Sequence, residues 1–212
     1  MAASELDFAS ALAAARAIRR GDVSSVELTT HLLGRIQQFN LKLNAIVTLT
    51  AEAALERARA ADLARARGEW WGPFHGVPCT IKDSFETAEV RTTAGAPLFA
   101  NHVPEADARV VTRLRAAGAV ILGKTNTPLL ASDVQSYNDI FGTTNNPWDP
   151  SRTPGGSSGG EAAAFAEAWR CVFCPPTLGR GGLLRTTKKR VVQSLRFQHA
   201  DPPLASRPPL AR

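Results

Sequence analysis

Cysteine is scarce in this chain of 212 residues, and its three copies are Cys79, Cys171 and Cys174. Three cysteines are too few for a disulfide scaffold. Cys171 and Cys174 have the spacing of half a zinc site or of a redox pair, but no second Cys/His pair completes such a site. We therefore expect no metal ion and no cofactor.

Long apolar runs are also lacking, so no segment is expected to span a bilayer. The N-terminus has no basic region followed by an apolar stretch, as a secretory signal would. These absences favour a cytoplasmic protein without a membrane partner. A Ser-His-Asp triad is not indicated either, because no ordered motif combines a histidine with a serine and an aspartate. The histidines are His31, His75, His102 and His199.

Positive charge is concentrated in the last part of the chain. Nine of the 25 lysines and arginines, but only one of the 19 acidic residues, follow residue 168. Residues 1–168 thus carry a net charge near −2 and residues 169–212 one near +8. The latter also hold six of the 14 prolines, so we predict a basic, Pro/Arg-rich tail of low order. Its run Lys188-Lys189-Arg190 would suit a polyanion or would be a solvated charge run; we do not expect a nucleic acid partner.

Helical and strand-like patterns alternate through residues 1–168, which predicts an α/β layered fold. A serine three residues before a glutamate, Ser24 and Glu27, marks the start of one helix. The expected helices are 8–20, 24–38, 52–67, 107–117, 126–132 and 160–168. The expected strands are 77–81 and 119–122, and the expected loop is 143–160.

Two adjacent serines, Ser157 and Ser158, lie in a glycine-rich run immediately before the last expected helix. The run could be a flexible linker, but a linker rarely precedes a helix start directly. A phosphate-binding loop is disfavoured because the Lys-Ser/Thr of a P-loop is missing. The remaining interpretation is a serine at a helix N-terminus, where free N–H groups and the helix dipole favour developing negative charge.

Lys82 closes an apolar strand and permits two interpretations. A strand-end lysine can extend its amine to water. A buried lysine, in contrast, loses its proton more easily and can act as a general base. The next residue, Asp83, is expected to be a structural hydrogen-bonding group.

Four motifs resemble those of the amidase signature family, in that family's order and with compatible gaps. They are Gly76-Val-Pro-Cys-Thr-Ile-Lys-Asp83, Gly118-Ala-Val-Ile-Leu-Gly-Lys-Thr-Asn126, Phe141-Gly-Thr-Thr-Asn-Asn-Pro-Trp148 and Pro154-Gly-Gly-Ser-Ser-Gly-Gly-Glu-Ala-Ala-Ala164. The resemblance covers roughly residues 5 to 168. It implies a mixed sheet flanked by helices, incomplete on its C-terminal side, with residues 1–168 as the N-terminal part of an amidase domain.

The resemblance also implies a Ser-Ser-Lys triad that hydrolyses the C–N bond of a small linear amide. Lys82 matches the family's lysine base, and Ser157 matches the bridging serine, whose preceding peptide bond is cis in the family. Ser158 would support Ser157 by hydrogen bonding. In the resulting relay, Lys82 takes a proton from Ser157, and Ser157 takes one from a nucleophilic serine.

The serine that would be acylated has no counterpart at the expected place. In one alignment Leu183 occupies its position, and in another the segment is deleted; Ser194 and Ser206 lack flanking glycines and are not nominated. We therefore expect a truncated or rearranged chain, a fragment with impaired catalysis. The alternatives are a subunit of an amidotransferase that moves ammonia to a glutamyl-tRNA, and a non-enzymatic protein that binds polyanions through its basic tail.

Overall fold

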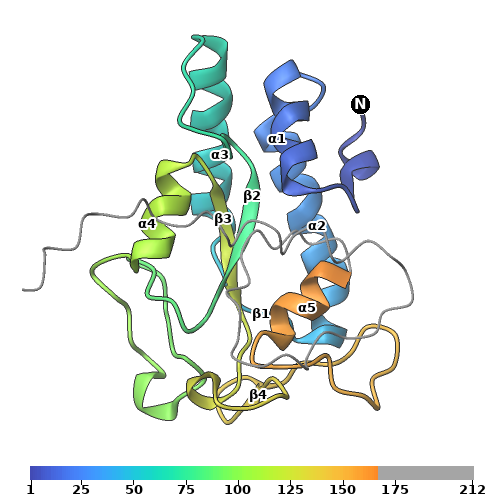
Figure 1. Ribbon diagram of the computed structural model, residues 1–212, viewed down its shortest axis with the longest axis vertical. Helices are drawn as coiled ribbons and strands as arrows, with labels where there is room; N and C mark the ends of the chain where they lie inside the picture. The colour runs from blue at the N-terminus through green and yellow to red at the C-terminus, as the bar shows by residue number, and fades with distance from the viewer. Residues whose placement is uncertain (167–212) are drawn as a thin grey trace, which may run out of the picture.

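The computed structural model describes residues 1–166. They form a mixed α/β structure in which helices lie on both faces of a small sheet (Figure 1). The helices are α1 (Ala11–Arg20), α2 (Ser25–Leu43), α3 (Ala51–Ala66), α4 (Arg109–Ala116) and α5 (Gly159–Ala166). The strands are β1 (Ile46–Leu49), β2 (Pro78–Lys82), β3 (Val120–Thr125), β4 (Tyr137–Asn138) and β5 (Gly142–Thr143). The 3₁₀ helices are η1 (Ala3–Leu6), η2 (Pro97–Phe99) and η3 (Leu129–Ala131).

The central sheet has the strand order β1-β3-β2. Strand β3 pairs antiparallel with β1 and parallel with β2. Lys82 lies opposite Thr125 in the parallel pair, and Ile81 lies opposite Lys124. Strands β4 and β5 form a separate two-stranded antiparallel pair. Because side chains alternate between the two faces of a strand, β3 contributes apolar residues to a core on each side.

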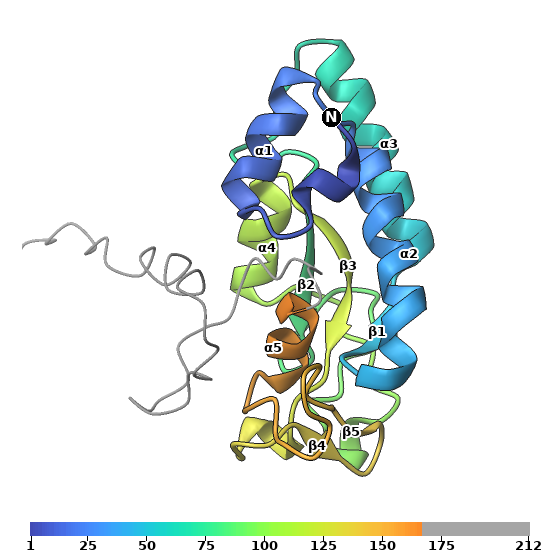
Figure 2. The same cartoon turned by 90° about the vertical axis from the view of Figure 1, so that its right-hand side faces the viewer.

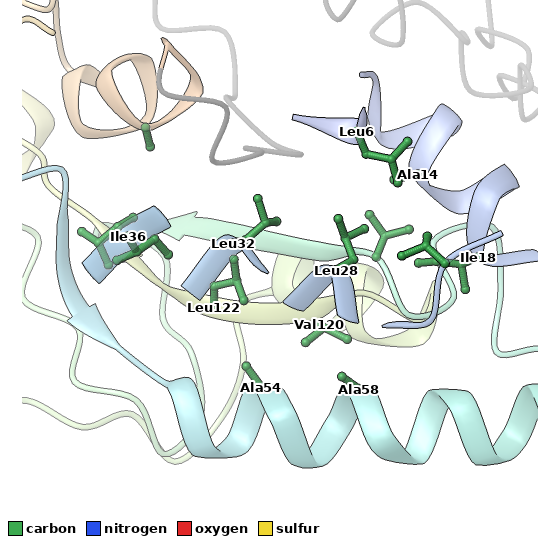
Figure 3. Packing of buried hydrophobic residues seen from close by; sticks show 14 of the residues in the cluster. Leu6, Ala14, Ile18, Leu28, Leu32, Ile36, Ala54, Ala58, Val120 and Leu122 are labelled. Carbon is green, nitrogen blue, oxygen red and sulfur yellow. The ribbon is translucent and has the colours of Figure 1, made fainter. Parts of the chain in front are cut away.

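The larger core lies between the sheet and helices α1, α2, α3 and α5, which Figure 2 shows around the strands. Leu28, Leu32 and Ile36 repeat at helical spacing along α2 and are all buried. They pack with Val120 and Leu122 of β3 (Figure 3). Alanines of α3 in the same cluster lack bulk, which lets α3 approach the sheet closely.

The smaller core covers the opposite face of the sheet. Val111 and Leu114 of α4 pack there against Ile121 of β3 and against Cys79 and Ile81 of β2. The two faces of β2 therefore have different surroundings: one is apolar and covered by α4, while the other carries Lys82.

Most of the expected elements are confirmed within a few residues of their ends. Helix α2 begins at the expected capping box, in which the hydroxyl of Ser24 accepts from the Glu27 N–H and the Glu27 carboxylate accepts from the Ser24 N–H. The helix continues to Leu43, five residues beyond the expected end at residue 38, and stops where Asn44 adopts a left-handed conformation. Within residues 1–166, no helix is both long and apolar enough to cross a membrane.

The secondary structure departs from expectation in three places: strand β1, the pair of strands β4 and β5, and the helix expected over residues 126–132. Strand β1 was not expected; its four residues exist as a strand because they pair with distant β3. The helix expected over residues 126–132 is absent apart from the short η3. Its first residue, Asn126, uses its side chain to bind surrounding loops, and Pro128 disfavours helical geometry in the residue before it. The expected domain boundary at residue 168 and the tail 169–212 lie outside the described residues.

Candidate active site

Lys82 and Ser157 meet in a buried site at the end of β2. The Nζ atom of Lys82 donates a hydrogen bond of 2.7 Å to Oγ of Ser157. The two residues are only 2% and 5% exposed. Strand pairing with β3 fixes Lys82, and the loop that leads into α5 carries Ser157. The fold thus brings together two of the residues that the resemblance singled out.

The backbone around Ser157 is held by neighbouring hydroxyl groups. The Oγ1 atom of Thr127 donates to the Ser157 carbonyl at 3.0 Å, and Ser136 Oγ lies 3.5 Å from the same oxygen. Ser136 Oγ also accepts from the N–H of Gly159 at 2.8 Å. The peptide bond between Gly156 and Ser157 is cis, as the resemblance implies. Hydroxyl groups from two other loops thus hold the Ser157 backbone in place.

Asn126 organises the floor beneath this loop and was not singled out from the sequence. Its Nδ2 donates to the Gly142 carbonyl at 3.1 Å and to Thr144 Oγ1 at 3.0 Å. Its Oδ1 accepts from the Thr127 N–H and from Asn138 Nδ2. The sequence signal was a polar run, Thr125 to Thr127, at the end of a buried strand. Apart from Thr127, its partners lie 12 to 18 residues away in the chain, so spacing alone could not reveal them.

Two glycines of the serine-containing run are required by close packing. A Cβ atom on Gly156 would lie 2.4 Å from the carbonyl carbon of Val134. A Cβ atom on Gly160 would lie 2.4 Å from the backbone nitrogen of Asn126. A side chain at either position would push the serine-carrying loop away from the backbone of Val134 or of Asn126. The glycines therefore allow Ser157 to reach Lys82.

Ser158 follows Ser157 directly and lies at the start of α5. Its hydroxyl is buried but forms no hydrogen bond with any group of residues 1–166. Its carbonyl accepts from the Ala162 N–H and so starts α5. The helical start directs the backbone of Ser158 into α5, and no bond to Ser157 forms. Support of Ser157 by Ser158 stays a prediction.

Asp83, the residue after Lys82, and Lys124 belong to a second network. Asp83 Oδ2 accepts from the N–H and the hydroxyl of Thr93 at 3.1 and 2.5 Å, consistent with the expected structural role. Lys124 Nζ lies 4.0 Å from Asp83 Oδ1. Burial raises the pKa of the Asp83 carboxyl above its usual range and lowers the pKa of the Lys124 amine to about 8. Each group therefore favours its neutral form more than it would in water.

The remaining candidates either lie apart from this site or outside the described residues. His31 contacts Asp7 at 2.5 Å, and His75 contacts the Ala61 carbonyl at 2.9 Å, so both have partners elsewhere. His102 lies 3.7 Å from Glu86. Within residues 1–166 no cluster of three His, Cys, Asp or Glu could hold a metal ion. Six residues lie beyond the described part: Cys171, Cys174, Leu183, Ser194, His199 and Ser206.

Comparison with protein families matches residues 27–171 to the family described as Amidase. The match covers more than half of the chain. This chain belongs to the Amidase family. Among curated relatives, a glutamyl-tRNA(Gln) amidotransferase subunit of Moorella thermoacetica is 49% identical over 149 residues, which are 70% of this chain and 31% of the relative. The corresponding subunit of Chloroflexus aurantiacus (strain J-10-fl) is 44% identical over 183 residues, 85% of this chain and 37% of the relative.

Solved structures of family members share the fold described above. A 6-aminohexanoate cyclic dimer hydrolase superimposes with a TM-score of 0.69 and 34% identity, over 77% of this chain and 32% of the other. A fatty acid amide hydrolase superimposes with a TM-score of 0.73 and 26% identity, over 79% of this chain and 30% of the other. The chain thus spans about a third of the length of the relatives it matches.

Proposed function

We propose that this Amidase-family chain carries the lysine base and the bridging serine of a Ser-Ser-Lys site for amide hydrolysis. The observation that supports this most directly is the 2.7 Å hydrogen bond between Lys82 Nζ and Ser157 Oγ. The bond lies within the range over which a proton can pass between two groups. The site is buried, and burial favours the neutral form of an amine, which is the form that accepts a proton.

The proposed reaction moves two protons along one line. Neutral Lys82 takes the hydroxyl proton of Ser157, and Ser157 takes the hydroxyl proton of the acylating serine. The oxygen of that serine then attacks the amide carbonyl carbon. Breakdown of the tetrahedral intermediate expels ammonia or an amine, which receives a proton, and leaves an acyl-enzyme that water hydrolyses to the acid. Backbone N–H groups beside the nucleophile would stabilise the oxyanion, and Ser158 would support Ser157.

We also propose that this chain is truncated or rearranged and does not complete the reaction efficiently by itself. The sequence offers no glycine-flanked serine after Ser158, and Leu183 or a deletion stands where the family's acylating serine is expected. Without that serine the proton relay has no final donor.

An amidotransferase-type subunit is the second candidate. It is supported by the curated relatives, which include two glutamyl-tRNA(Gln) amidotransferase subunits with 49% and 44% identity. A chain of that type would take part in moving ammonia to a glutamyl-tRNA rather than act on unrelated linear amides. A panel of small amides therefore distinguishes the two candidates.

The decisive experiment supplies the missing nucleophile. In a chimera, residues 1–166 are joined to the corresponding continuation of the Moorella thermoacetica relative, and ammonia release from the amide panel is measured. We expect turnover, and we expect Lys82→Met and Ser157→Ala to reduce kcat/KM by at least about 100-fold. The matched controls Lys42→Met and Ser4→Ala, at exposed positions, should leave kcat/KM unchanged. An active chimera that tolerates Lys82→Met would refute the proposed base.

The natural chain tests the second half of the proposal. We expect no stable labelling of any serine by a fluorophosphonate probe and no turnover of the amide panel. Stoichiometric labelling of a single serine, located by mass spectrometry, would show that a nucleophile is present after all.

A further inference from the structure

Lys124 is a second buried lysine, and it lies on the opposite face of the sheet from Lys82. It occupies β3 beside Ile81, whereas Lys82 pairs with the next residue, Thr125. Because paired residues of neighbouring strands share a face of the sheet, Lys124 lies on the face of Ile81, which α4 covers. Its side chain is fully buried. The proposed proton relay lies on the other face of the sheet and does not include Lys124.

The hydrogen bonds of Lys124 define its protonation state. Its Nζ donates to the Phe85 carbonyl at 2.7 Å, to Thr92 Oγ1 at 2.6 Å and to Thr87 Oγ1 at 3.1 Å. The hydroxyl proton of Thr87 is used on the Phe85 carbonyl, and that of Thr92 on the Val90 carbonyl. All three acceptors can therefore only accept from Nζ. Three donated protons require the charged ammonium form.

The three acceptors belong to one segment, which we call the β2 loop (residues 83–93). The loop starts directly after Lys82 and folds back on its own beginning. The Phe85 N–H donates to the Lys82 carbonyl at 3.0 Å, and the Ala94 N–H donates to the Asp83 carbonyl at 3.1 Å. Lys124 occupies the middle of this loop and binds three points along it.

A buried ammonium ion is a costly way to fill space. Replacing a buried ionic group with an apolar one of similar volume is often neutral or stabilising. Stability is therefore a poor explanation for a lysine at this position, whereas the three bonds give it a specific effect on the loop. The carboxylate of Asp83, 4.0 Å away, offsets part of the charge.

We propose that Lys124 is a positioning residue, whose ammonium holds the β2 loop closed and thereby fixes the end of β2 that presents Lys82 to Ser157. Its significance for catalysis rests on the proposed function, in which Lys82 is the base. The geometric effect on the loop does not require turnover. The effect of Lys124 on the loop and the proposed function of Lys82 as a base can therefore be refuted separately.

Hydrogen exchange of the full natural chain tests the effect on the loop. We expect Lys124→Met to accelerate exchange of the amides of residues 83–94 by at least about 10-fold, while α2 remains protected. Thr92→Val removes one acceptor with little change of shape and should produce a smaller acceleration in the same peptides. Unchanged exchange over residues 83–94 in Lys124→Met would overturn the proposal. If that variant fails to fold, unchanged exchange in Thr92→Val would overturn it.

Chemical reactivity of Lys82 provides a readout that a mere space-filling role would not change. In the natural chain Lys82 is 2% exposed, and we expect slow acetylation by acetic anhydride relative to exposed Lys42 in the same molecule. In Lys124→Met and Thr92→Val the ratio of Lys82 to Lys42 acetylation should rise, by about 10-fold in the former. A ratio that stays constant while the loop exchanges faster would show that Lys124 orders the loop but does not position Lys82. Turnover of the chimera described above reports separately on the proposed function.

Discussion

Asn138 donates from Nδ2 to Oδ1 of Asn126 over 2.7 Å, and this pair joins the β4 strand to the end of β3 beneath the serine-carrying loop. Both side chains are buried. Asn126 uses its donor and acceptor atoms on four groups, which belong to Thr127, Asn138, Gly142 and Thr144. The site thus depends on a polar network as much as on its lysine and serine.

Removal of this network should be costly. We predict that Asn126→Ala lowers the free energy of unfolding by about 2–4 kcal/mol, because it leaves several buried groups without partners. Urea unfolding followed by circular dichroism measures the change. Exposed Asn101 supplies the matched control, and Asn101→Ala should stay within about 0.5 kcal/mol of the natural chain. Equal effects of the two substitutions would contradict the assigned importance of the network.

Gly156 should tolerate no side chain. A Cβ atom would lie 2.4 Å from the Val134 carbonyl carbon, so Gly156→Ala must displace backbone. We predict a loss of about 1–3 kcal/mol or more in urea unfolding. Gly34 in the interior of α2 has no atom within 4 Å of such a Cβ, and Gly34→Ala should stabilise the protein by about 0.5–1 kcal/mol. The two substitutions should change the free energy of unfolding in opposite directions, and a change in the same direction would contradict the prediction.

The capping box of α2 should give stability a dependence on acidic pH. Hydrogen bonds from the backbone and hydroxyl of Ser24 lower the pKa of the Glu27 carboxyl from its usual 4.5. A lowered pKa in the folded state means that the stabilisation is present above pH 4.5 and is lost as the pH falls through the folded value. We predict that Glu27→Gln flattens the fall in urea midpoint on acidification. Exposed Glu56 forms no cap, so Glu56→Gln should retain the natural profile.

The contributions of Lys124 and Cys79 to the free energy of unfolding should change in opposite directions at alkaline pH. Burial lowers the pKa of Lys124 from 10.5 to about 8, so its unfavourable contribution at neutral pH disappears as the pH rises from about 8 to 10.5. Burial raises the pKa of Cys79 from 9.0 to about 12, so its favourable contribution is lost as the pH rises from about 9 to 12. We predict that Lys124→Met loses stability over pH 8–10 relative to its own value at pH 8, since only the thiol effect remains.

The complementary variant isolates the other group. Cys79→Ala keeps the amine and should gain stability from pH 8 to 10 more steeply than the natural chain does. Urea midpoints at four pH values for the three proteins suffice. Parallel profiles for the natural chain and Lys124→Met would contradict the assigned burial of the ammonium.

Local sequence predicted the helices well because their start and stop signals lie within a few residues of one another. Ser24 and Glu27 are three residues apart, and Gly21 ends α1 in a left-handed conformation. Strand β1 could not be found in this way, because its four residues become a strand only by pairing with β3, more than 70 residues later. The helix expected over residues 126–132 does not form for a related reason, because the side chain of its first residue, Asn126, bonds to distant residues.

The site residues likewise divide into those that local sequence identifies and those that only the structure reveals. Lys82 and Ser157 were identified from motifs that each occupy a few consecutive residues. The residues that hold them, such as Thr127, Ser136 and Asn138, carry no local pattern and act through contacts across 10 to 30 positions or more. Lys124 lies in one of the four motifs that resemble the amidase signature, yet only the structure reveals that its three partners surround one ammonium.

The strand order has a consequence for how the chain is made. The central strand of the sheet, β3, is also the last of its three strands to be synthesised, and its neighbours β1 and β2 do not pair with each other. Each of them therefore emerges from the ribosome without a partner and waits until residues 120–125 follow. During that interval helices α1, α2 and α3, whose backbone hydrogen bonds are local, are able to form. Nascent chains that stop before β3 should carry unpaired strands, while those that continue through it can close the sheet in one step.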